Sequence, residues 1–244
     1  MSAVKLIKFG NKTILSPQGT RQYRTVLLSD SKGITLKQKR YDPIHTEIKW
    51  MCESGTNTTG AINTLRRNLI DLIQENTHIW LYVWIGTCDL TQLDSSTRYI
   101  TLKSFESNTV IQKLKSEFEL ICEILNHHPG NKITFLELPF YPIVKWNSVH
   151  NHKEPSSFQE QDRALENQII QLNSEIKILS ERNQTFSSDF NFDLYRTSKT
   201  KRHGGRQVSR RYFNLEQYTD GIHPSPIQAK SWLMKFTLRY IKDC

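Results

Sequence analysis

Short apolar runs alternate with amphipathic segments of helical period along this chain, and that alternation limits the possible folds more than any other feature. The run at residues 78–85 (HIWLYVWI) is almost continuously apolar, as expected of a strand covered on both faces of a sheet. Further strands are predicted at residues 24–28, 47–52 and 132–138, and helices at residues 58–74, 109–125, 162–181 and 226–242. This order predicts an α/β fold in which a mostly parallel sheet lies between two layers of helices, a three-layer α/β/α sandwich.

The composition is that of a globular chain. Hydrophobic residues make up 37% and aromatic residues 10% of the 244 residues, too many for a disordered chain. No linker rich in Pro, Gly or Ser divides the sequence, so we expect one domain over residues 1–244, with an N-terminal extension at 1–22. No apolar run reaches the roughly 20 residues of a membrane span, and residues 1–20 lack the apolar core of a signal peptide. We therefore expect a soluble, intracellular protein.

Positive charge is concentrated in one segment. Residues 196–211 contain seven Lys and Arg residues and no acidic residue, and they account for most of the net charge of +9. We predict a basic loop insertion at residues 196–213, and such charge runs are usually solvated and flexible. Clustered cations beside aromatic residues also suit phosphate backbones and stacked bases. The candidate polyanion-binding residues are Lys201, Arg202, Arg206, Arg210 and Arg211.

Small, polar or glycine-containing turns follow three of the predicted strands. They occupy residues 29–33, 53–57 and 86–89, and a fourth polar turn at residues 220–225 precedes the last helix. The carboxyl ends of parallel strands meet at one edge of the sheet, and ligands bind outside that edge. The sequence therefore predicts a functional site where these turns meet.

The four turns resemble the sequence blocks of the SGNH (GDSL-type) serine hydrolases. In that family the blocks are Gly-Asp-Ser, a single Gly, Gly-x-Asn-Asp and Asp-x-x-His, in this order. The matching residues here are Ser29-Asp30-Ser31, Gly55, Gly86-Thr87-Cys88-Asp89 and Asp220-Gly221-Ile222-His223. The resemblance spans about Val26 to Tyr240. It implies a flavodoxin-like three-layer sandwich, the SGNH hydrolase fold, and an ester hydrolase.

Ser31, His223 and Asp220 are the candidate catalytic residues. A serine hydroxyl is a poor nucleophile until a base takes its proton, and imidazole is such a base near neutral pH. Asp220 lies three residues before His223 and can hold the ring through Nδ1. We expect this triad to cleave an ester substrate without a metal or an organic cofactor. On the residues alone, Asp220 could instead be a turn residue, and His223 could simply introduce the last helix.

The expected oxyanion hole departs from the family pattern at one position. The resemblance places two donors on the backbone N–H groups of Ser31 and Gly55, and a third on the side chain of the family's Asn. Cys88 stands in place of that Asn, and a thiol is a much weaker donor than an amide. Loss of one donor predicts a rate roughly 10²–10³ lower, unless Asn57 or the Thr87 hydroxyl substitutes for it.

The segment after the fourth predicted strand, residues 140–158, leaves the sheet at the same edge. Its aromatic residues Phe140, Tyr141 and Trp146 either wall a substrate pocket or cover the edge of the core. The sequence thus predicts a serine esterase or acyl-hydrolase. The alternative is a catalytically weak or inactive SGNH-like scaffold that binds nucleic acid or another polyanion through its basic loop, as would suit a protein encoded by a mobile element.

Overall fold

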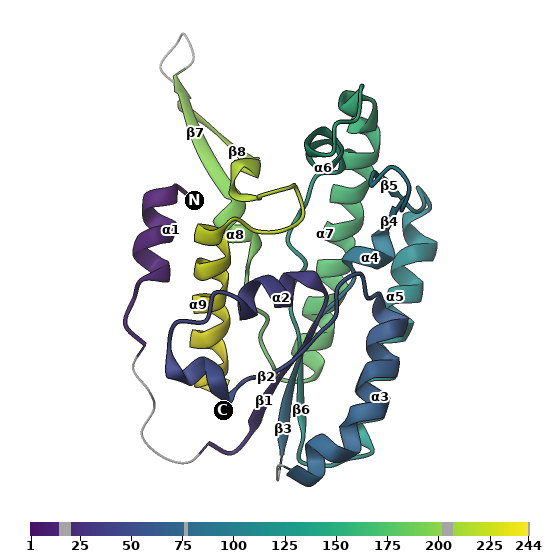
Figure 1. Ribbon diagram of the computed structural model, residues 1–244, viewed down its shortest axis with the longest axis vertical. Coiled ribbons are helices and arrows are strands. Elements are labelled where there is room, and N and C mark those ends of the chain that lie inside the picture. Colours follow the sequence, from purple (N-terminus) through teal and green to yellow (C-terminus); the bar gives the residue numbers. More distant parts are fainter. Residues whose placement is uncertain (15–20, 76–77, 202–206, 244) are drawn as a thin grey trace.

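A parallel sheet lies at the centre of the protein (Figure 1). The computed structural model describes residues 1–14, 21–75, 78–201 and 207–243, with residues 196–201 and 207–212 described by their backbone alone. The strands of the sheet are β1 (Arg24–Ser29), β2 (Lys49–Cys52), β3 (Ile79–Trp84) and β6 (Lys132–Phe135), in the order β2-β1-β3-β6. Each neighbouring pair is parallel, so the predicted parallel sheet is confirmed.

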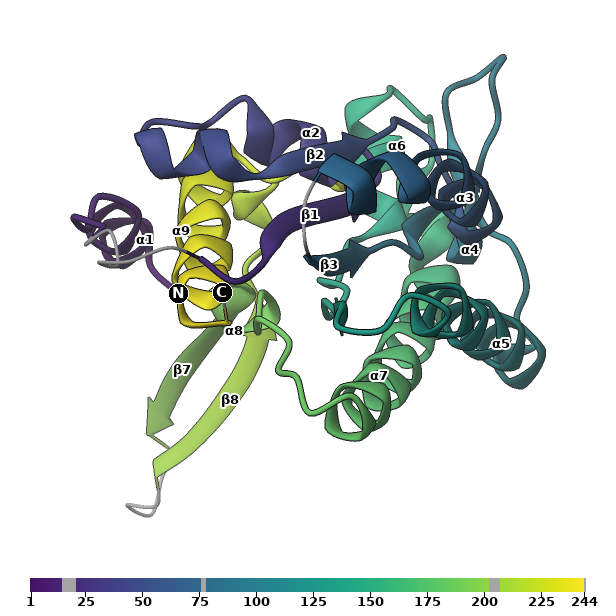
Figure 2. The same ribbon diagram turned by 90° about the horizontal axis from the view of Figure 1, so that it is seen from below.

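Helices cover both faces of the sheet, as the alternation predicts. The helices on one face are α2 (Ser31–Lys37) and α9 (Pro226–Asp243), and those on the other are α3 (Thr58–Glu75), α5 (Ser107–Asn126) and α7 (Gln159–Arg182) (Figures 1 and 2). The four longer helices begin and end within one turn of their predicted positions. None of the helices in the described residues is both long and apolar enough to cross a membrane. The α/β/α sandwich predicted from the sequence is confirmed.

Apolar side chains from both helical layers meet around β3, whose residues are all buried. At its end, the Trp84 ring packs 4.6 Å from that of Phe190 and 5.7 Å from that of Trp232 in α9 (centroid distances). Because helices cover both faces of β3, both of its faces must be apolar, which explains the continuous apolar run.

Several short elements lie outside the predicted strands and helices. The helix α1 (Ala3–Gly10), in the predicted N-terminal extension, packs against α9. The others are α4 (Thr87–Leu90), α6 (Ile143–Val149), α8 (Asn191–Leu194), the 3₁₀ helices Pro43–Glu47, Pro155–Phe158 and Leu215–Gln217, and the hairpin of β4 (Thr91–Leu93) and β5 (Ile100–Leu102). Elements this short contain too few residues to display a helical or strand period.

The basic segment forms a β-hairpin rather than the predicted loop. β7 (Tyr195–Lys201) pairs antiparallel with β8 (Gln207–Phe213), and the ribbon projects away from the body of the protein (Figures 1 and 2). At its base the Phe213 ring lies 4.7 Å from that of Tyr195 and 4.4 Å from that of Phe140. The strand residues are mostly polar or charged, so the sequence lacks the apolar alternation that marks a half-buried strand.

The chain reverses its direction along the sheet at β1. From β1 it passes to β2 on one side, and it then returns across β1 to β3 on the other side. Doubly wound proteins bind their ligands at the carboxyl end of the strand where this reversal occurs. Ser31 follows β1 directly, so the fold places it at that position.

Candidate active site

Ser31 is the first residue of α2, directly after the end of β1. Asp30 caps this helix, because its Oδ1 accepts a hydrogen bond of 2.9 Å from the backbone N–H of Lys32. Gly33 lies so close to the sheet that a Cβ at this position would be 2.6 Å from the Sγ of Cys52. A glycine here allows the helix to start at the edge of the sheet, and this start fixes the place of the Ser31 side chain.

Three side chains that are far apart in the sequence form a continuous hydrogen-bonded chain. The Oγ of Ser31 lies 2.9 Å from Nε2 of His223, and Nδ1 of the same ring lies 2.6 Å from Oδ2 of Asp220. The other carboxylate oxygen of Asp220 accepts hydrogen bonds from the backbone N–H groups of Ile222 (2.9 Å) and His223 (2.7 Å). These bonds hold the carboxylate, which in turn holds the imidazole. We call Ser31, His223 and Asp220 the candidate triad.

The same hydrogen bonds stabilise the charge of Asp220. Burial raises the pKa of its carboxyl group, but hydrogen bonds from the His223 ring and from the backbone N–H groups of His223 and Ile222 outweigh that effect. The pKa of Asp220 is therefore lowered, and the side chain is an anion at neutral pH. An anion beside Nδ1 favours the tautomer with its proton on Nδ1, which leaves Nε2 free to accept the Ser31 proton.

The turn that carries the histidine packs against the backbone in the middle of α6. Gly221 has a φ of +106°, and a Cβ there would be 2.7 Å from the backbone N of Trp146. The centres of the Trp146 and His223 rings are 6.1 Å apart, and the indole N–H donates a hydrogen bond of 2.8 Å to the carbonyl oxygen of Arg98. A glycine at position 221 is therefore needed for the turn to approach the backbone of α6 this closely. The approach places the Trp146 indole, which is held by its hydrogen bond to Arg98, beside the His223 ring.

The loop at residues 53–57 crosses the carboxyl end of β1. Its first backbone N–H donates a hydrogen bond of 3.0 Å to the carbonyl oxygen of Ser29. Directly after the loop, the backbone N–H (2.9 Å) and the hydroxyl (2.8 Å) of Thr58 donate to Oδ2 of Asp89, in the turn after β3. Since β2 and β3 flank β1, the loop between these anchors passes over the end of β1. It carries Gly55, an exposed residue with a φ of +75°.

Cys88 lies in α4, the single helical turn that follows β3, at the position expected for the third oxyanion donor. It is a free, partly exposed cysteine, and burial raises the pKa of its thiol to about 11, so the thiol is neutral at pH 7. The two side chains that could substitute for it both accept hydrogen bonds from elsewhere. Oδ1 of Asn57 accepts the backbone N–H of Gly60 at 2.9 Å, and Oγ1 of Thr87 accepts from Nζ of Lys32. Their own amide and hydroxyl hydrogens remain as candidate donors.

Solved structures of hydrolases share this architecture. A GDSL-like lipase from Bacteroides thetaiotaomicron VPI-5482 matches with a TM-score of 0.57 at 13% sequence identity, over 99% of this chain and 95% of its own. The lipase/acylhydrolase from Enterococcus faecalis matches with a TM-score of 0.52 at 11% identity, over 91% and 96%. An acetyl xylan esterase matches with a TM-score of 0.51 at 11% identity, over 87% and 96%. The chain has the SGNH hydrolase fold.

This fold is recognised by its architecture and not by overall sequence similarity. No protein-family model and no curated protein matches the sequence. The SGNH fold that the four short sequence blocks imply is confirmed by these structures of lipases and esterases. At sequence identities of 11–13%, the similarity shows the fold alone.

The aromatic residues expected at a substrate pocket are all buried in this SGNH fold. Trp146 lies beside His223, with the ring centres 6.1 Å apart. The hydroxyl of Tyr141 donates a hydrogen bond of 3.0 Å to the carbonyl oxygen of Thr87. Phe140 lines a cavity of about 250 Å³ between α7 and the base of the β7–β8 hairpin, and no residue of the candidate triad is among its described lining. Substrate binding by these aromatic residues stays a prediction.

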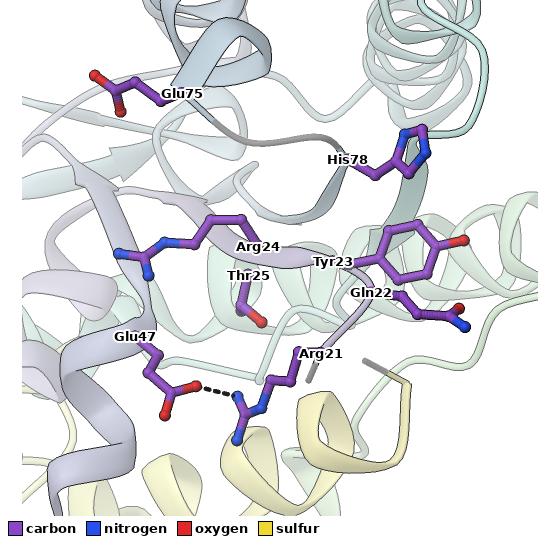
Figure 3. A pocket seen from close by; sticks show the side chains of 8 residues that line it. All are labelled: Arg21, Gln22, Tyr23, Arg24, Thr25, Glu47, Glu75 and His78. Carbon is purple, nitrogen blue, oxygen red and sulfur yellow. Dashed lines mark ion pairs between the residues drawn. The ribbon is translucent and has the colours of Figure 1, made fainter. Parts of the chain in front are cut away.

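A second cavity, of about 330 Å³, lies at the opposite end of the sheet, before the amino ends of β1 and β3 (Figure 3). It is lined by residues 21–25 and by Glu47, Glu75 and His78. Figure 3 shows Arg21 pointing toward Glu47, with which it forms an ion pair of 2.9 Å. No member of the candidate triad is among the described lining residues, so this cavity is separate from the candidate active site.

One residue beside the nucleophile, Lys32, is not among the predicted site residues, yet its side chain is buried together with that of Asp30. A lysine in a polar turn is normally exposed, and the signal that could have indicated otherwise is the carboxylate two residues before it. Three of the predicted polyanion-binding residues belong to the strands of the β7–β8 hairpin, Lys201 to β7 and Arg210 and Arg211 to β8. Arg202 and Arg206 lie outside the described residues.

Proposed function

We propose that the chain is a serine esterase or acyl-hydrolase that cleaves carboxylic esters with the candidate triad. The observation that carries the proposal is the hydrogen-bonded chain from Ser31 Oγ through the His223 ring to the Asp220 carboxylate, with distances of 2.9 and 2.6 Å. The SGNH fold supports it, because Ser31 follows the strand whose carboxyl end is the usual ligand site of a doubly wound sheet.

In the first half of the reaction, Ser31 Oγ attacks the carbonyl carbon of the ester while its proton moves to Nε2 of His223. The ester C–O bond then breaks, the imidazolium returns the proton to the leaving alcohol, and an acyl-serine remains. Asp220 stabilises the imidazolium from the Nδ1 side. In the second half, water attacks the acyl-serine with the same histidine as base, which releases the carboxylic acid and restores Ser31.

The negative charge that develops on the carbonyl oxygen needs donors that are already in place. The backbone N–H groups of Ser31 and Gly55 are the proposed donors, with the Cys88 thiol as a weak third. Within the part of the chain that the structure describes, neither N–H donates a hydrogen bond to another protein group, which supports their assignment to a bound oxyanion.

Treatment of the purified protein with a fluorophosphonate probe is expected to produce one covalent adduct, on Ser31, because an activated serine attacks phosphorus as it attacks an ester carbonyl. The adduct is located by mass spectrometry after digestion. Ser31→Ala should carry no adduct, and Ser116→Ala, an exposed serine on α5, should be labelled like the wild type. A folded wild-type protein that stays unlabelled, under conditions that label a control esterase, would reject the proposal.

Binding of nucleic acid or another polyanion by the β7–β8 hairpin is a second candidate function. The observation that supports this function is the shape of the basic segment. It projects from the body of the protein as a two-stranded antiparallel ribbon (Figure 2). A ribbon of this kind is narrow enough to enter the major groove of a duplex. The two strands contain no acidic residue, and their cations are Arg196, Lys199, Lys201, Arg210 and Arg211.

Replacing Arg202, Arg206, Arg210 and Arg211 with Gln is expected to weaken binding to duplex DNA. It should also reduce the slope of log K against log salt by up to about 3–4, since each phosphate contact contributes about 0.9 to that slope. Fluorescence anisotropy of a labelled duplex at several salt concentrations measures both quantities. The matched control replaces four exposed cations elsewhere with Gln, namely Arg40, Arg66, Arg67 and Lys113. Equal affinity and slope for the hairpin variant and the wild type would reject this function.

A further inference from the structure

Lys32 follows the candidate nucleophile directly, yet its side chain is buried. The side chain of Lys32 is 2% exposed and that of Asp30 is 1% exposed, and the atoms Nζ and Oδ2 of this ion pair are 2.5 Å apart. Nζ also lies 5.5 Å from the centre of the Trp84 ring. Burying an ammonium group is costly, and an apolar side chain of the same length would fill the space without that cost. Packing alone therefore does not explain a lysine here.

The buried ammonium joins two turns of the candidate active site. Its Nζ donates hydrogen bonds to Oδ2 of Asp30 and to Oγ1 of Thr87. Asp30 and Lys32 are the residues on either side of Ser31, so the pair brackets the nucleophile. Thr87 directly precedes Cys88 in the turn after β3. The ion pair thus links the turn that carries the nucleophile to the turn where the third oxyanion donor is expected.

Thr87 is also held from its other side. Its carbonyl oxygen accepts hydrogen bonds from the hydroxyl groups of Tyr141 (3.0 Å) and Thr91 (3.1 Å). These two hydroxyl oxygens are 3.2 Å apart, and both residues are buried. The turn before Cys88 is therefore fixed between the Lys32 ammonium and this pair of hydroxyl groups.

We propose that Lys32 is a positioning residue, which holds the nucleophile turn and the Cys88 turn at a fixed separation through Asp30 and Thr87. This inference rests on the proposed ester hydrolysis and adds to it the residue that sets the geometry of the oxyanion hole. An oxyanion hole with a weak third donor depends strongly on the placement of the others, and a displacement of about 1 Å can cost roughly 10²-fold in rate.

A direct electrostatic role for the ammonium fits these contacts less well. Asp30 neutralises it at 2.5 Å, and both hydrogen-bond partners of Nζ are buried. At Cys88, burial raises the pKa of the thiol most, while the Asp30 carboxylate raises it and the Lys32 ammonium lowers it. The two charges of the pair therefore oppose each other where the third donor is expected, and the role left to Lys32 is geometric.

Replacing Asp30 and Lys32 together with uncharged residues separates an effect on the geometry of the site from an effect on folding. The variant Asp30→Asn/Lys32→Met keeps the volume of the pair and the side-chain oxygen that caps α2, so its melting temperature should lie within about 5 °C of that of the wild type. Its rate constant for fluorophosphonate labelling of Ser31 should fall by about 10–100-fold, because Thr87 has lost its link to the nucleophile turn. Lys32→Met alone leaves the Asp30 carboxylate buried without a partner, and should melt roughly 6–20 °C lower.

Thr87→Val breaks the same link from the other side. It should slow labelling to a similar extent, and adding it to Asp30→Asn/Lys32→Met should cause little further loss, because coupled residues are not additive. The matched control is Asp193→Asn/Lys235→Met, which removes an ion pair of 2.8 Å at another buried aspartate. That control should be labelled at the wild-type rate.

Two results would overturn the positioning role and leave the esterase proposal intact. One is a folded Asp30→Asn/Lys32→Met variant whose Ser31 is labelled within about twofold of the wild-type rate, and the other is a set of losses that multiply in the triple variant. A folded wild-type protein that is not labelled at all would overturn both proposals.

Discussion

His223→Ala is expected to lower kcat/KM for an activated ester such as p-nitrophenyl acetate by roughly 10⁴–10⁶-fold. In the wild type, Nε2 of His223 lies 2.9 Å from the Ser31 hydroxyl, in position to take its proton during attack. Without the imidazole, the proton must go to water, which is a far weaker base at neutral pH. The measurement is steady-state hydrolysis with the uncatalysed background subtracted.

The matched control for this variant is His150→Ala. His150 also lies near the site, stacked 4.2 Å from the Trp146 ring, but it has no hydrogen bond to Ser31 or Asp220 among the described residues. Its activity should stay close to that of the wild type. Because the triad acts as a unit, Ser31→Ala/His223→Ala should be no slower than His223→Ala alone. A folded His223→Ala variant that keeps more than about a tenth of the activity would contradict the proposed base.

The position of the candidate active site could be predicted from the sequence because two independent patterns agree on it. The apolar run of β3 and the periods of the long helices indicate a parallel sheet, and a parallel sheet brings its strand ends to one edge. The polar turns at those ends then place Ser31 and Cys88 together, although 57 positions separate them in the sequence. The family resemblance adds His223 and Asp220, for which periodicity alone gives no reason.

The burial of Lys32 and the hairpin could not be predicted in this way. Periodicity reports which positions are apolar, so it carries no information on a charged side chain that is buried because a carboxylate lies 2.5 Å away. The strands of the β7–β8 hairpin pair mainly with each other, and they need no apolar face to form backbone hydrogen bonds. Hydrophobic periodicity detects neither feature, because one depends on a charged partner and the other on backbone pairing.

Cys88→Asn is expected to raise kcat by roughly 10²–10³-fold. An amide N–H is a strong hydrogen-bond donor, whereas the thiol of Cys88 is neutral and a weak one, its pKa being raised to about 11 mainly by burial. A third strong donor would stabilise the oxyanion of the transition state by about 3–4 kcal/mol. Cys88 is partly exposed, so the longer side chain has room. Steady-state hydrolysis should show the gain in kcat with little change in KM, because the charge develops only in the transition state.

Two further variants, Cys88→Ala and Asn57→Ser, identify which group, if any, acts as the third oxyanion donor in the wild type. Cys88→Ala removes the thiol, and a fall in its kcat of the same order would show that the thiol already acts as the third donor. Asn57→Ser keeps a side-chain oxygen for the Gly60 N–H, and so preserves the helix cap, but removes the amide hydrogens. A loss of activity in Asn57→Ser alone would assign the third donor to Asn57, which lies on the loop that crosses β1. A gain in Cys88→Asn, with both other variants silent, would show that the wild-type site works with its two backbone donors.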